Sequence, residues 1–227
     1  RMFRQDDSHN YVTDEQIGTE IKDIVEIAKY LYSVFGLEYT LTLSTRPDDF
    51  MGEIETWNKA EKELKEVLTE ICGEGNYRIS EGDGAFYGPK IDIKMKDCLG
   101  REWQMGTVQL DFQLPQRFNL SYIDREGNKK TPIMIHRAIF GSFDRFIGIL
   151  TEHYAGAFPT WLSPVQVRVL PIATAHNEYA KEIKEKFEEA GIRVELDQRE
   201  EKIGYKIREA QLQKIPYMII LGDKEIQ

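Results

Sequence analysis

The sequence predicts an α+β protein in which a domain with an antiparallel sheet flanked by helices precedes a small α/β domain with a mainly parallel sheet. Three observations lead to this prediction. Hairpins follow one another between residues 90 and 135, prolines interrupt the segment 158–164, and strands alternate with helices from residue 165 onward. We expect the first domain to span residues 1–163 and the second to span residues 164–227.

Composition and charge narrow the class of protein. Of 227 residues, 41% are hydrophobic and 11% are aromatic, which is enough apolar material for a core. No apolar run is long enough for a transmembrane helix, and the first residues lack the apolar centre of a signal peptide. Cys72 and Cys98 lie in separate segments, which indicates neither a disulfide framework nor a CxxC metal site and favours a cytoplasmic protein. The net charge of −9 argues against nucleic-acid binding through bulk positive charge, so such contacts should depend on local clusters.

The first nine residues alternate in a way that predicts a strand. Phe3, Gln5, Asp7 and His9 lie two apart and would share one face. A run of polar residues on one face is typical of a strand that lines a polar cleft. Gln5 and Asp7 could bind a substrate there, around a metal held by His9.

Two helices and a strand are expected next. A capping box at residues 13–16 starts a helix that ends near residues 35–36. Alternation predicts a strand at 39–43, and helical spacing of apolar residues predicts a second helix at 54–71.

The period of the hydrophobic pattern then changes to two. It predicts strands at 91–95 and 102–112, and a further hairpin made of residues 121–124 and 132–135. Helical spacing follows at residues 137–154.

The second domain has the pattern of repeated strand–helix–strand units. Strands are predicted at 165–169, 192–196 and 217–221, with helices at 178–190 and 206–214 between them. Such alternation implies a parallel sheet.

Two histidines are candidate metal ligands. His9 ends the first predicted strand, and His136 follows an apolar strand and is expected to start a helix. Histidine is a common zinc ligand, but each could equally cap a helix or be a hydrogen-bonded core residue. We expect His153 and His176 to be surface residues.

A glycine-rich segment at 82–90 precedes a predicted strand. It lacks the GxxxxGK[ST] pattern of a P-loop. It is either a plain hairpin loop or a loop that brings Tyr87 and Lys90 to a ligand.

Polar side chains also recur on the strand 102–112. Thr107, Gln109 and Asp111 share a face by period two, with Gln104 nearby. This face is either solvated or, together with the polar strand 1–9, the floor of a cleft.

Arg145 lies at the start of an apolar helical segment. Its guanidinium could stack on a ring and grip a phosphate, or it could simply pair with a neighbouring carboxylate such as Asp144 or Glu152.

Taken together, these segments resemble the threonyl-tRNA synthetases, a family of class II aminoacyl-tRNA synthetases. The resemblance is collinear over the whole chain, and its order makes it more specific than any single motif. The matching segments are 1–9 (RMFRQDDSH), 84–90 (GAFYGPK), 103–112 (WQMGTVQLDF), 134–138 (MIHRA), 141–145 (GSFDR), 201–208 (EKIGYKIR) and 222–225 (GDKE).

The resemblance implies a site for L-threonine. His9 and His136 match two ligands of a catalytic Zn²⁺, and Asp7 matches the acceptor of the threonine hydroxyl. Tyr87 matches a contact to the amino group and Gln5 a contact to the carboxylate. Valine is nearly isosteric with threonine but has no hydroxyl, so such a site would reject it.

The resemblance also implies a site for ATP with Mg²⁺. Phe3 and Arg145 match the pair that sandwiches adenine, and Gln104 and Thr107 match positions at the ribose. Arg145, Gln5 and Lys90 are the residues we expect to act in catalysis. The further site-lining positions implied by the resemblance are Lys90, Gln109 and Ser142.

The implied activity is that of a threonine–tRNA ligase, which activates L-threonine with ATP to threonyl-adenylate and transfers it to the 3′ end of tRNA(Thr) for protein synthesis. The resemblance further implies a homodimer in the intact enzyme, a cytoplasmic location and no membrane partner. The family's third zinc ligand (a cysteine), motif 1, the first motif 2 arginine and the editing domain have no counterpart here, and the second domain should be incomplete. We therefore expect the fragment to bind Zn²⁺ weakly and to be inactive alone.

Three other interpretations compete with this one. The chain could belong to another synthetase of the same subgroup, such as the prolyl or glycyl enzyme, without the paired zinc histidines. It could be a paralogue that binds tRNA or a partner without catalysis, although the complete set of site residues speaks against this. It could also be an unrelated α+β protein, which the collinear motifs disfavour.

Overall fold

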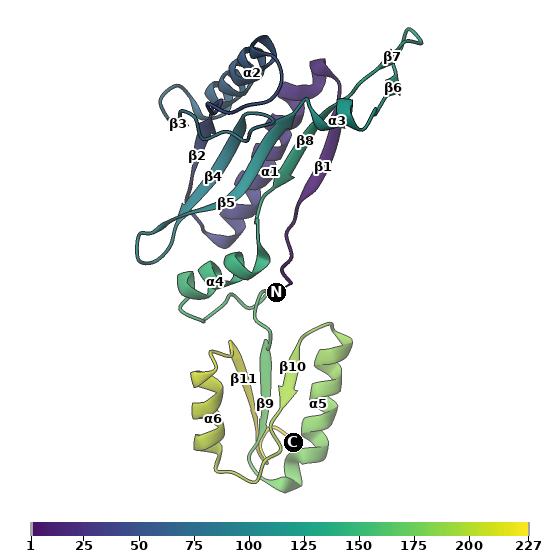
Figure 1. Ribbon diagram of the computed structural model, residues 1–227. Coiled ribbons are helices and arrows are strands. Elements are labelled where there is room, and N and C mark those ends of the chain that lie inside the picture. Colours follow the sequence, from purple (N-terminus) through teal and green to yellow (C-terminus); the bar gives the residue numbers. More distant parts are fainter. Residues whose placement is uncertain (1, 227) are drawn as a thin grey trace. The chain divides into compact units, whose positions relative to one another are not determined.

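The computed structural model describes residues 2–226, and the chain divides into two compact units between Ile149 and Leu150. A six-stranded sheet forms the centre of the first unit, and a three-stranded sheet that of the second (Figure 1). The sequence-based domain boundary at residues 163/164 lies somewhat beyond this division and stays a prediction. The expected fold class, a mostly antiparallel sheet followed by a parallel one, is confirmed.

The large sheet has the strand order β1-β8-β5-β4-β2-β3, and all neighbours are antiparallel except the parallel pair β2 and β3. Its strands are β1 (Ser8–Val12), β2 (Tyr39–Ser44), β3 (Arg78–Ser80), β4 (Lys90–Lys96), β5 (Glu102–Asp111) and β8 (Ile133–Ala138). The helices are η1 (Asp14–Gln16), α1 (Ile17–Phe35), α2 (Ile54–Cys72), α3 (Leu114–Arg117) and α4 (Phe143–His153). A separate hairpin consists of β6 (Tyr122–Ile123) and β7 (Lys129–Lys130).

The first long helix begins and ends where the sequence predicts. The Thr13 backbone N–H donates to Gln16 Oε1 at 2.9 Å, which closes the capping box. Gly36 has φ +67° and donates its N–H to the Ser33 carbonyl, which ends the helix in a left-handed cap. One apolar face of the helix, including Ile21 and Ile24, is buried.

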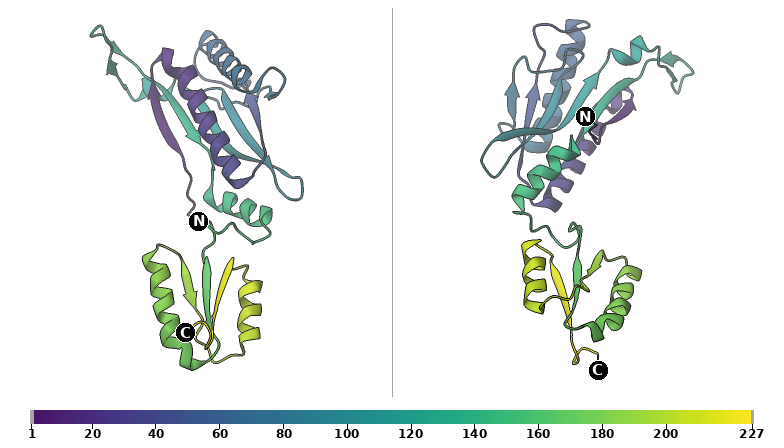
Figure 2. Two further views of the ribbon diagram at one scale, coloured as in Figure 1. Left: turned by 180° about the vertical axis from the view of Figure 1, so that it is seen from behind. Right: turned by 60° about the horizontal axis from the view of Figure 1, so that its bottom comes forward.

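That apolar face covers one side of the sheet. Figures 1 and 2 show α1 lying along the sheet from opposite directions. The alternating apolar residues Ile91, Ile93, Val108 and Leu110 are completely buried, as the period-two pattern predicts. The polar residues between them therefore belong to the other side of the sheet, and the candidate site lies there.

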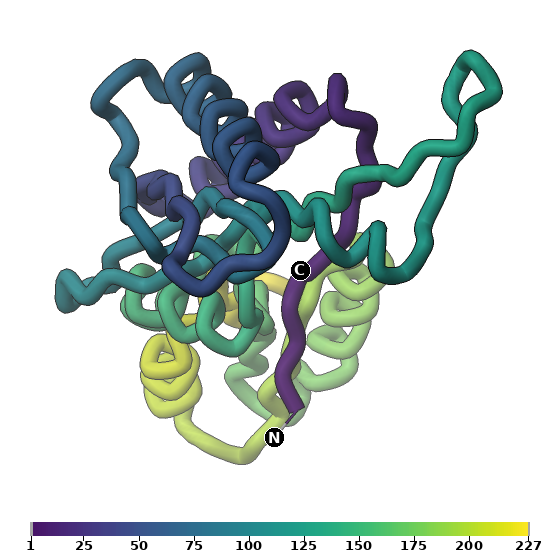
Figure 3. The backbone as a smooth tube through the Cα atoms, turned by 45° about the horizontal axis from the view of Figure 1, so that its top comes forward, coloured from purple at the N-terminus to yellow at the C-terminus, as the bar shows by residue number. Residues whose placement is uncertain are grey.

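The predicted strand over residues 1–9 is wrong in extent. The ladder of β1 starts at Ser8, and Gln5 makes only an isolated bridge with Ser142 (Figure 3 shows the extended run before β1). The reason is that a side chain replaces ladder bonds here. Asp6 accepts the backbone N–H groups of residues 139–141 at 2.8–3.1 Å.

Two further predictions around residues 121–154 need correction. The segment 132–135 does not pair with 121–124, because it lies in β8 between β1 and β5, whereas β6 pairs with β7. The predicted helix 137–154 starts only at Phe143, so His136 lies within a strand. A turn at Gly141 (φ +64°) separates the two elements, and a Cβ there would lie 2.2 Å from the Met105 carbonyl oxygen.

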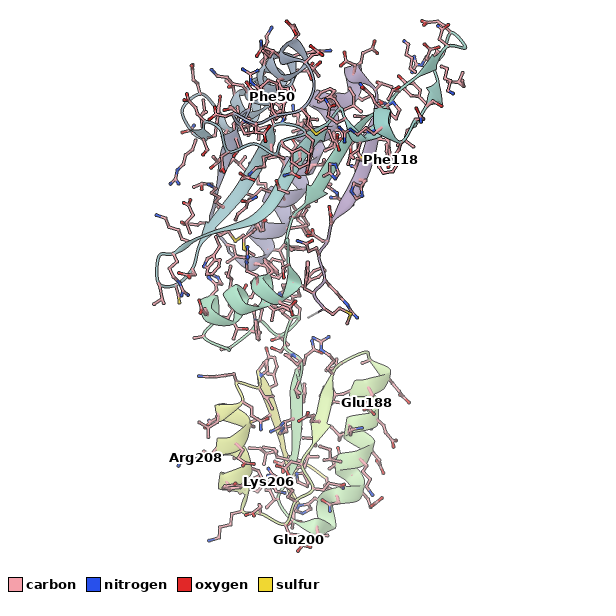
Figure 4. The ribbon with its side chains drawn as sticks, in the orientation of Figure 1. Phe50, Phe118, Glu188, Glu200, Lys206 and Arg208 are labelled. Atoms are coloured by element: carbon pink, nitrogen blue, oxygen red, sulfur yellow. The ribbon has the colours of Figure 1, made fainter. Side chains whose placement is uncertain are left out.

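The second unit is a parallel sheet with the order β10-β9-β11 and one helix beside each edge strand (Figure 4). Its elements are β9 (Val167–Pro171), η2 (Thr174–His176), α5 (Asn177–Glu189), β10 (Val194–Leu196), α6 (Ile203–Leu212) and β11 (Tyr217–Leu221). All five predicted elements are present, with boundaries shifted by a few residues. Its core is formed by Val167, Val169, Ala180 and Leu221.

His176 is not the surface residue that the sequence suggested. It is 6% exposed, its Nδ1 accepts the N–H of Ala173 at 3.2 Å, and its Nε2 lies 2.9 Å from Asp223 Oδ1. The imidazole thus joins the loop after β9 to the loop after β11. His153 is exposed, as expected.

Candidate active site

One row of directly opposed residues crosses five strands of the large sheet. His9 on β1 is paired with His136 on β8, and His136 with Gln109 on β5. Gln109 is paired with Lys90 on β4, and Lys90 with Ser44 on β2. Directly opposed residues lie on the same face of a sheet, so the row lines a single surface. Four of its five members are residues singled out from the sequence.

The two histidines meet at one end of this row. Their ring centroids are 4.7 Å apart, with the planes nearly perpendicular. His136 Nε2 lies 2.9 Å from Asp111 Oδ2, and the Asp111 side chain is completely buried. We call the group of His9, Tyr87, Gln109, Asp111 and His136 the histidine end of the site.

Asp111 is held as an anion. Burial raises its pKa, but hydrogen bonds from His136 and from the N–H groups of Leu114 and Gln113 outweigh burial, so the pKa lies below its usual value. An ionised carboxylate only accepts, so His136 Nε2 is the donor in this hydrogen bond. A carboxylate that orients an imidazole in this way is the usual second partner of a metal-binding histidine.

Tyr87 reaches the histidine end from the glycine-rich loop. Its hydroxyl donates to Gln109 Oε1 at 2.7 Å, and its ring centroid is 5.4 Å from that of His136. Burial raises the pKa of Tyr87, and the carboxylates of Asp111 and Asp7 raise it further, so the phenol stays protonated. A Cβ on Gly88 would lie 1.7 Å from the Leu110 carbonyl oxygen, so glycine is needed to bring the loop this close.

A second carboxylate organises the other end of the row. Asp92 is completely buried and accepts from Lys90 Nζ at 2.6 Å and Ser44 Oγ at 2.8 Å through one oxygen. Its other oxygen accepts from Gln104 Nε2 at 2.6 Å and Thr107 Oγ1 at 3.3 Å. We call these five residues the aspartate end. Lys90, Gln104 and Thr107 are predicted site residues, whereas the sequence does not predict Asp92 and Ser44.

A β-bulge brings Gln104 and Thr107 to the same carboxylate. Residues three apart on a regular strand point to opposite faces. The register between β4 and β5 shifts at Ile93/Lys94, so Lys94 is paired with Gln104 and Ile93 with Gly106. The extra residue, Met105, reverses the parity of the strand. The one sequence signal for Asp92 was that it is the only carboxylate on a strand face whose other members are Lys90, Lys94 and Lys96.

Arg145 belongs to the aspartate end. Its Nη1 donates to the Gln104 carbonyl at 3.0 Å, and its guanidinium carbon lies 5.3 Å from the centroid of the Trp103 ring. The side chain is exposed. The structure therefore places the Arg145 guanidinium against the Trp103 ring and the Gln104 carbonyl. This favours support by these two groups over the surface ion pair with Asp144 or Glu152 that the sequence left open.

The N-terminal residues are brought to the start of α4. Gln5 makes an isolated β-bridge with Ser142, and the Phe143 N–H donates to the Arg4 carbonyl at 3.0 Å.

Asp7 is exposed, and its charge raises the pKa of Tyr87. Phe3 is 64% exposed and is not in ring contact with Arg145 in the described part of the chain.

The chain belongs to the family described as "tRNA synthetase class II core domain (G, H, P, S and T)", which it matches over residues 1–154. Residues 166–227 match the family described as "Anticodon binding domain". This excludes an unrelated α+β protein.

Within that class, the chain is similar to threonine–tRNA ligases. It is 59% identical to the ligase of Clostridium botulinum (strain Okra / Type B1) over 227 residues and 61% identical to that of Clostridium novyi (strain NT) over 226 residues. In both comparisons all of this chain is covered but only 35% of the relative. A solved RNA binding domain of threonyl-tRNA synthetase from Cryptosporidium parvum Iowa II superposes with a TM-score of 0.93 at 42% identity, covering this whole chain and 56% of that one.

A preformed metal cluster and a membrane-spanning helix are both absent from the described part of the chain. Among residues 2–226, no three His, Cys, Asp or Glu side chains are grouped so that they could hold a metal ion. None of the helices in this part of the chain is long and apolar enough to cross a membrane.

Proposed function

We propose that this chain carries out the chemistry of a threonine–tRNA ligase, as part of a protein of the relatives' length. The threonine carboxylate attacks the α-phosphorus of ATP and pyrophosphate leaves, which gives threonyl-adenylate. A hydroxyl at the 3′ end of tRNA(Thr) then attacks the threonyl carbonyl carbon, loses its proton, and AMP leaves. The row from His9 to Ser44 is the observation that carries the proposal, because it places two functionally different ends on one face of one sheet.

The histidine end is suited to a small amino acid. Tyr87 and Gln109 offer a linked donor and acceptor, and Asp7 adds an exposed carboxylate within electrostatic reach. Asp7 would accept the threonine hydroxyl proton, Tyr87 would contact the amino group and Gln5 the carboxylate. A site built to hydrogen-bond a substrate hydroxyl discriminates strongly against a substrate that lacks it.

His9 and His136 would hold Zn²⁺, with Asp111 orienting His136. The pair fits two ligands of such a site, because the rings are adjacent and Nδ1 of His136 is not used in the bond to Asp111. When bound, Zn²⁺ would supply a Lewis acid that binds the amino group and hydroxyl of the substrate.

The aspartate end is suited to ATP with Mg²⁺. Arg145 provides an exposed guanidinium, which binds phosphate and stacks on planar rings. Gln104 and Thr107 would lie at the ribose, Phe3 at the adenine, and Lys90 and Ser142 along the reacting groups.

Catalysis here consists of positioning and charge stabilisation, in which Arg145, Gln5 and Lys90 act on the substrates.

We further propose that residues 164–227 bind the anticodon region of tRNA(Thr), that residues 1–163 form the catalytic domain, and that the intact ligase is a cytoplasmic homodimer. The match to an anticodon-binding family supports the first statement. Sedimentation of the intact ligase tests the last, since a monomer would contradict it.

The decisive experiment is threonine-dependent ATP–pyrophosphate exchange, combined with metal analysis. We expect one Zn²⁺ per chain in a ligase of the relatives' length that carries this segment, and loss of both zinc and exchange in His136→Ala. His153→Ala is the matched control, since that histidine is exposed and outside the site. The 227-residue chain by itself should bind Zn²⁺ weakly and give no exchange.

The alternatives predict other outcomes. Full exchange without zinc, or exchange that follows proline or glycine instead of threonine, would indicate another synthetase of the subgroup. Binding of tRNA without exchange by the longer protein would indicate a non-catalytic paralogue.

A further inference from the structure

Trp103 on β5 joins a buried carboxylate to the exposed Arg145. Its indole Nε1 donates to Asp97 Oδ2 at 2.8 Å, and its ring lies 5.3 Å from the guanidinium carbon of Arg145. Neither Trp103 nor Asp97 belongs to the histidine end or the aspartate end. Both are therefore unexplained by the proposed contacts to threonine and ATP.

Asp97 accepts the indole N–H of Trp103 and is itself held by backbone hydrogen bonds. Its side chain is completely buried in the turn between β4 and β5, and its Oδ1 accepts the N–H groups of Leu99 and Arg101, both at 2.9 Å. Burial raises the pKa of Asp97, but the hydrogen bonds from Trp103 and Arg101 outweigh it and hold the pKa at about 2. The carboxylate is thus an acceptor with a fixed position at any physiological pH.

Arg145 is in turn fixed from two directions. The Trp103 ring lies against the guanidinium, at a distance within the range of a cation–π contact. The Gln104 carbonyl accepts from Nη1 at 3.0 Å, and Gln104 is itself held by Asp92. An exposed arginine has many rotamers, and ordering it before a ligand arrives reduces the entropy lost on binding.

We propose that Trp103 is a positioning residue for Arg145, and that Asp97 sets the orientation of the Trp103 ring. The proposal rests on the proposed function, in which Arg145 binds ATP. It extends the nucleotide site to a chain of contacts from the β4–β5 turn to α4. Trp103 itself touches no substrate, so its loss should weaken ATP binding without affecting threonine.

The test is Trp103→Leu in a ligase of the relatives' length, measured by threonine-dependent ATP–pyrophosphate exchange. We expect the KM for ATP to rise about three- to thirtyfold, the range of a cation–π contact, with the KM for threonine within twofold of wild type. Trp103→Phe keeps an aromatic face but loses the donor to Asp97, so it should recover only part of the loss. Leu99→Ala is the matched control, because that side chain is 72% exposed in the same turn.

A second measurement is independent of catalysis. In the 227-residue chain, the side-chain Nε–H resonance of Arg145, assigned with Arg145→Lys, should carry a ring-current shift that disappears in Trp103→Leu and persists in Trp103→Phe. An equal rise of both KM values, an unchanged KM for ATP, or a resonance insensitive to Trp103 would overturn the inference. Absence of exchange in wild type, with the ring-current shift present, would instead contradict the proposed function alone.

Discussion

The two ends of the site are each organised by a buried carboxylate, but the partners differ in kind. At the histidine end, Asp111 faces the His136 imidazole and two backbone N–H groups. At the aspartate end, Asp92 faces the Lys90 ammonium and three uncharged side-chain donors. The first arrangement orients an imidazole that we propose as a zinc ligand, whereas the second fixes several side chains around the Lys90–Asp92 ion pair. A buried carboxylate can thus orient a single ring or hold several side chains in place at once, depending on what donates to it.

The largest effect should come from breaking the aspartate end. Asp92→Ala leaves the nine-tenths-buried Lys90 without a counter-charge. Loss of one partner of a buried ion pair costs about 3–5 kcal/mol, and we expect that loss in the free energy of unfolding measured with urea. Lys59→Ala is the control, because its ion pair with Asp14 is exposed and should contribute less than about 1 kcal/mol. Equal effects of the two variants would show that Asp92 is not an organising charge.

Asp111→Asn sharpens the difference between the ends. The amide oxygen can still accept from Gln113 and Leu114, but its NH₂ group would face His136 Nε2 and force the proton onto Nδ1. We expect zinc affinity to fall about 10- to 100-fold, with a smaller loss of stability than in Asp92→Ala. Nitrogen chemical shifts of the His136 ring report the tautomer, and an unchanged tautomer would contradict the assigned role.

The same variant has a defined pH dependence. Because the pKa of Asp111 is lower in the folded protein than its ordinary value of 3.8, the ionised carboxylate stabilises the fold above that value. This contribution decreases as the pH falls through the lower, folded pKa. The stability difference between wild type and Asp111→Asn should therefore be constant above about pH 5 and shrink in acid. Urea unfolding at a series of pH values measures it, and a difference that grows in acid would reverse the sign.

The smallest of these effects is expected at Tyr87. Tyr87→Phe removes one uncharged hydrogen bond to Gln109, which should cost about 0.5–1.5 kcal/mol of stability. The effect on function should be selective, since this end is proposed to bind threonine. A rise in the KM for ATP larger than that for threonine would place Tyr87 at the wrong end.

Much of this molecule was accessible from local sequence. The limits of α1 follow from a capping box and a terminal glycine, and the buried faces of β4 and β5 follow from period two. The elements of the second unit follow from the alternation of strand and helix patterns. These signals work because they depend on neighbours a few residues apart. The candidate residues were also recognised one by one, from their types and from the collinear resemblance.

What the sequence could not determine is how distant segments register against one another. Only the pairing of β1, β8 and β5 places His9, His136 and Gln109 in one row, and only the bulge at Met105 turns Gln104 and Thr107 toward Asp92. Asp6 likewise ends the predicted first strand by binding backbone groups far along the chain. Residue types and periodicity thus determined which side chains were available and which elements would form. Tertiary structure decided which of them meet, because parity, register and the burial of a carboxylate are set by strands that are remote in sequence.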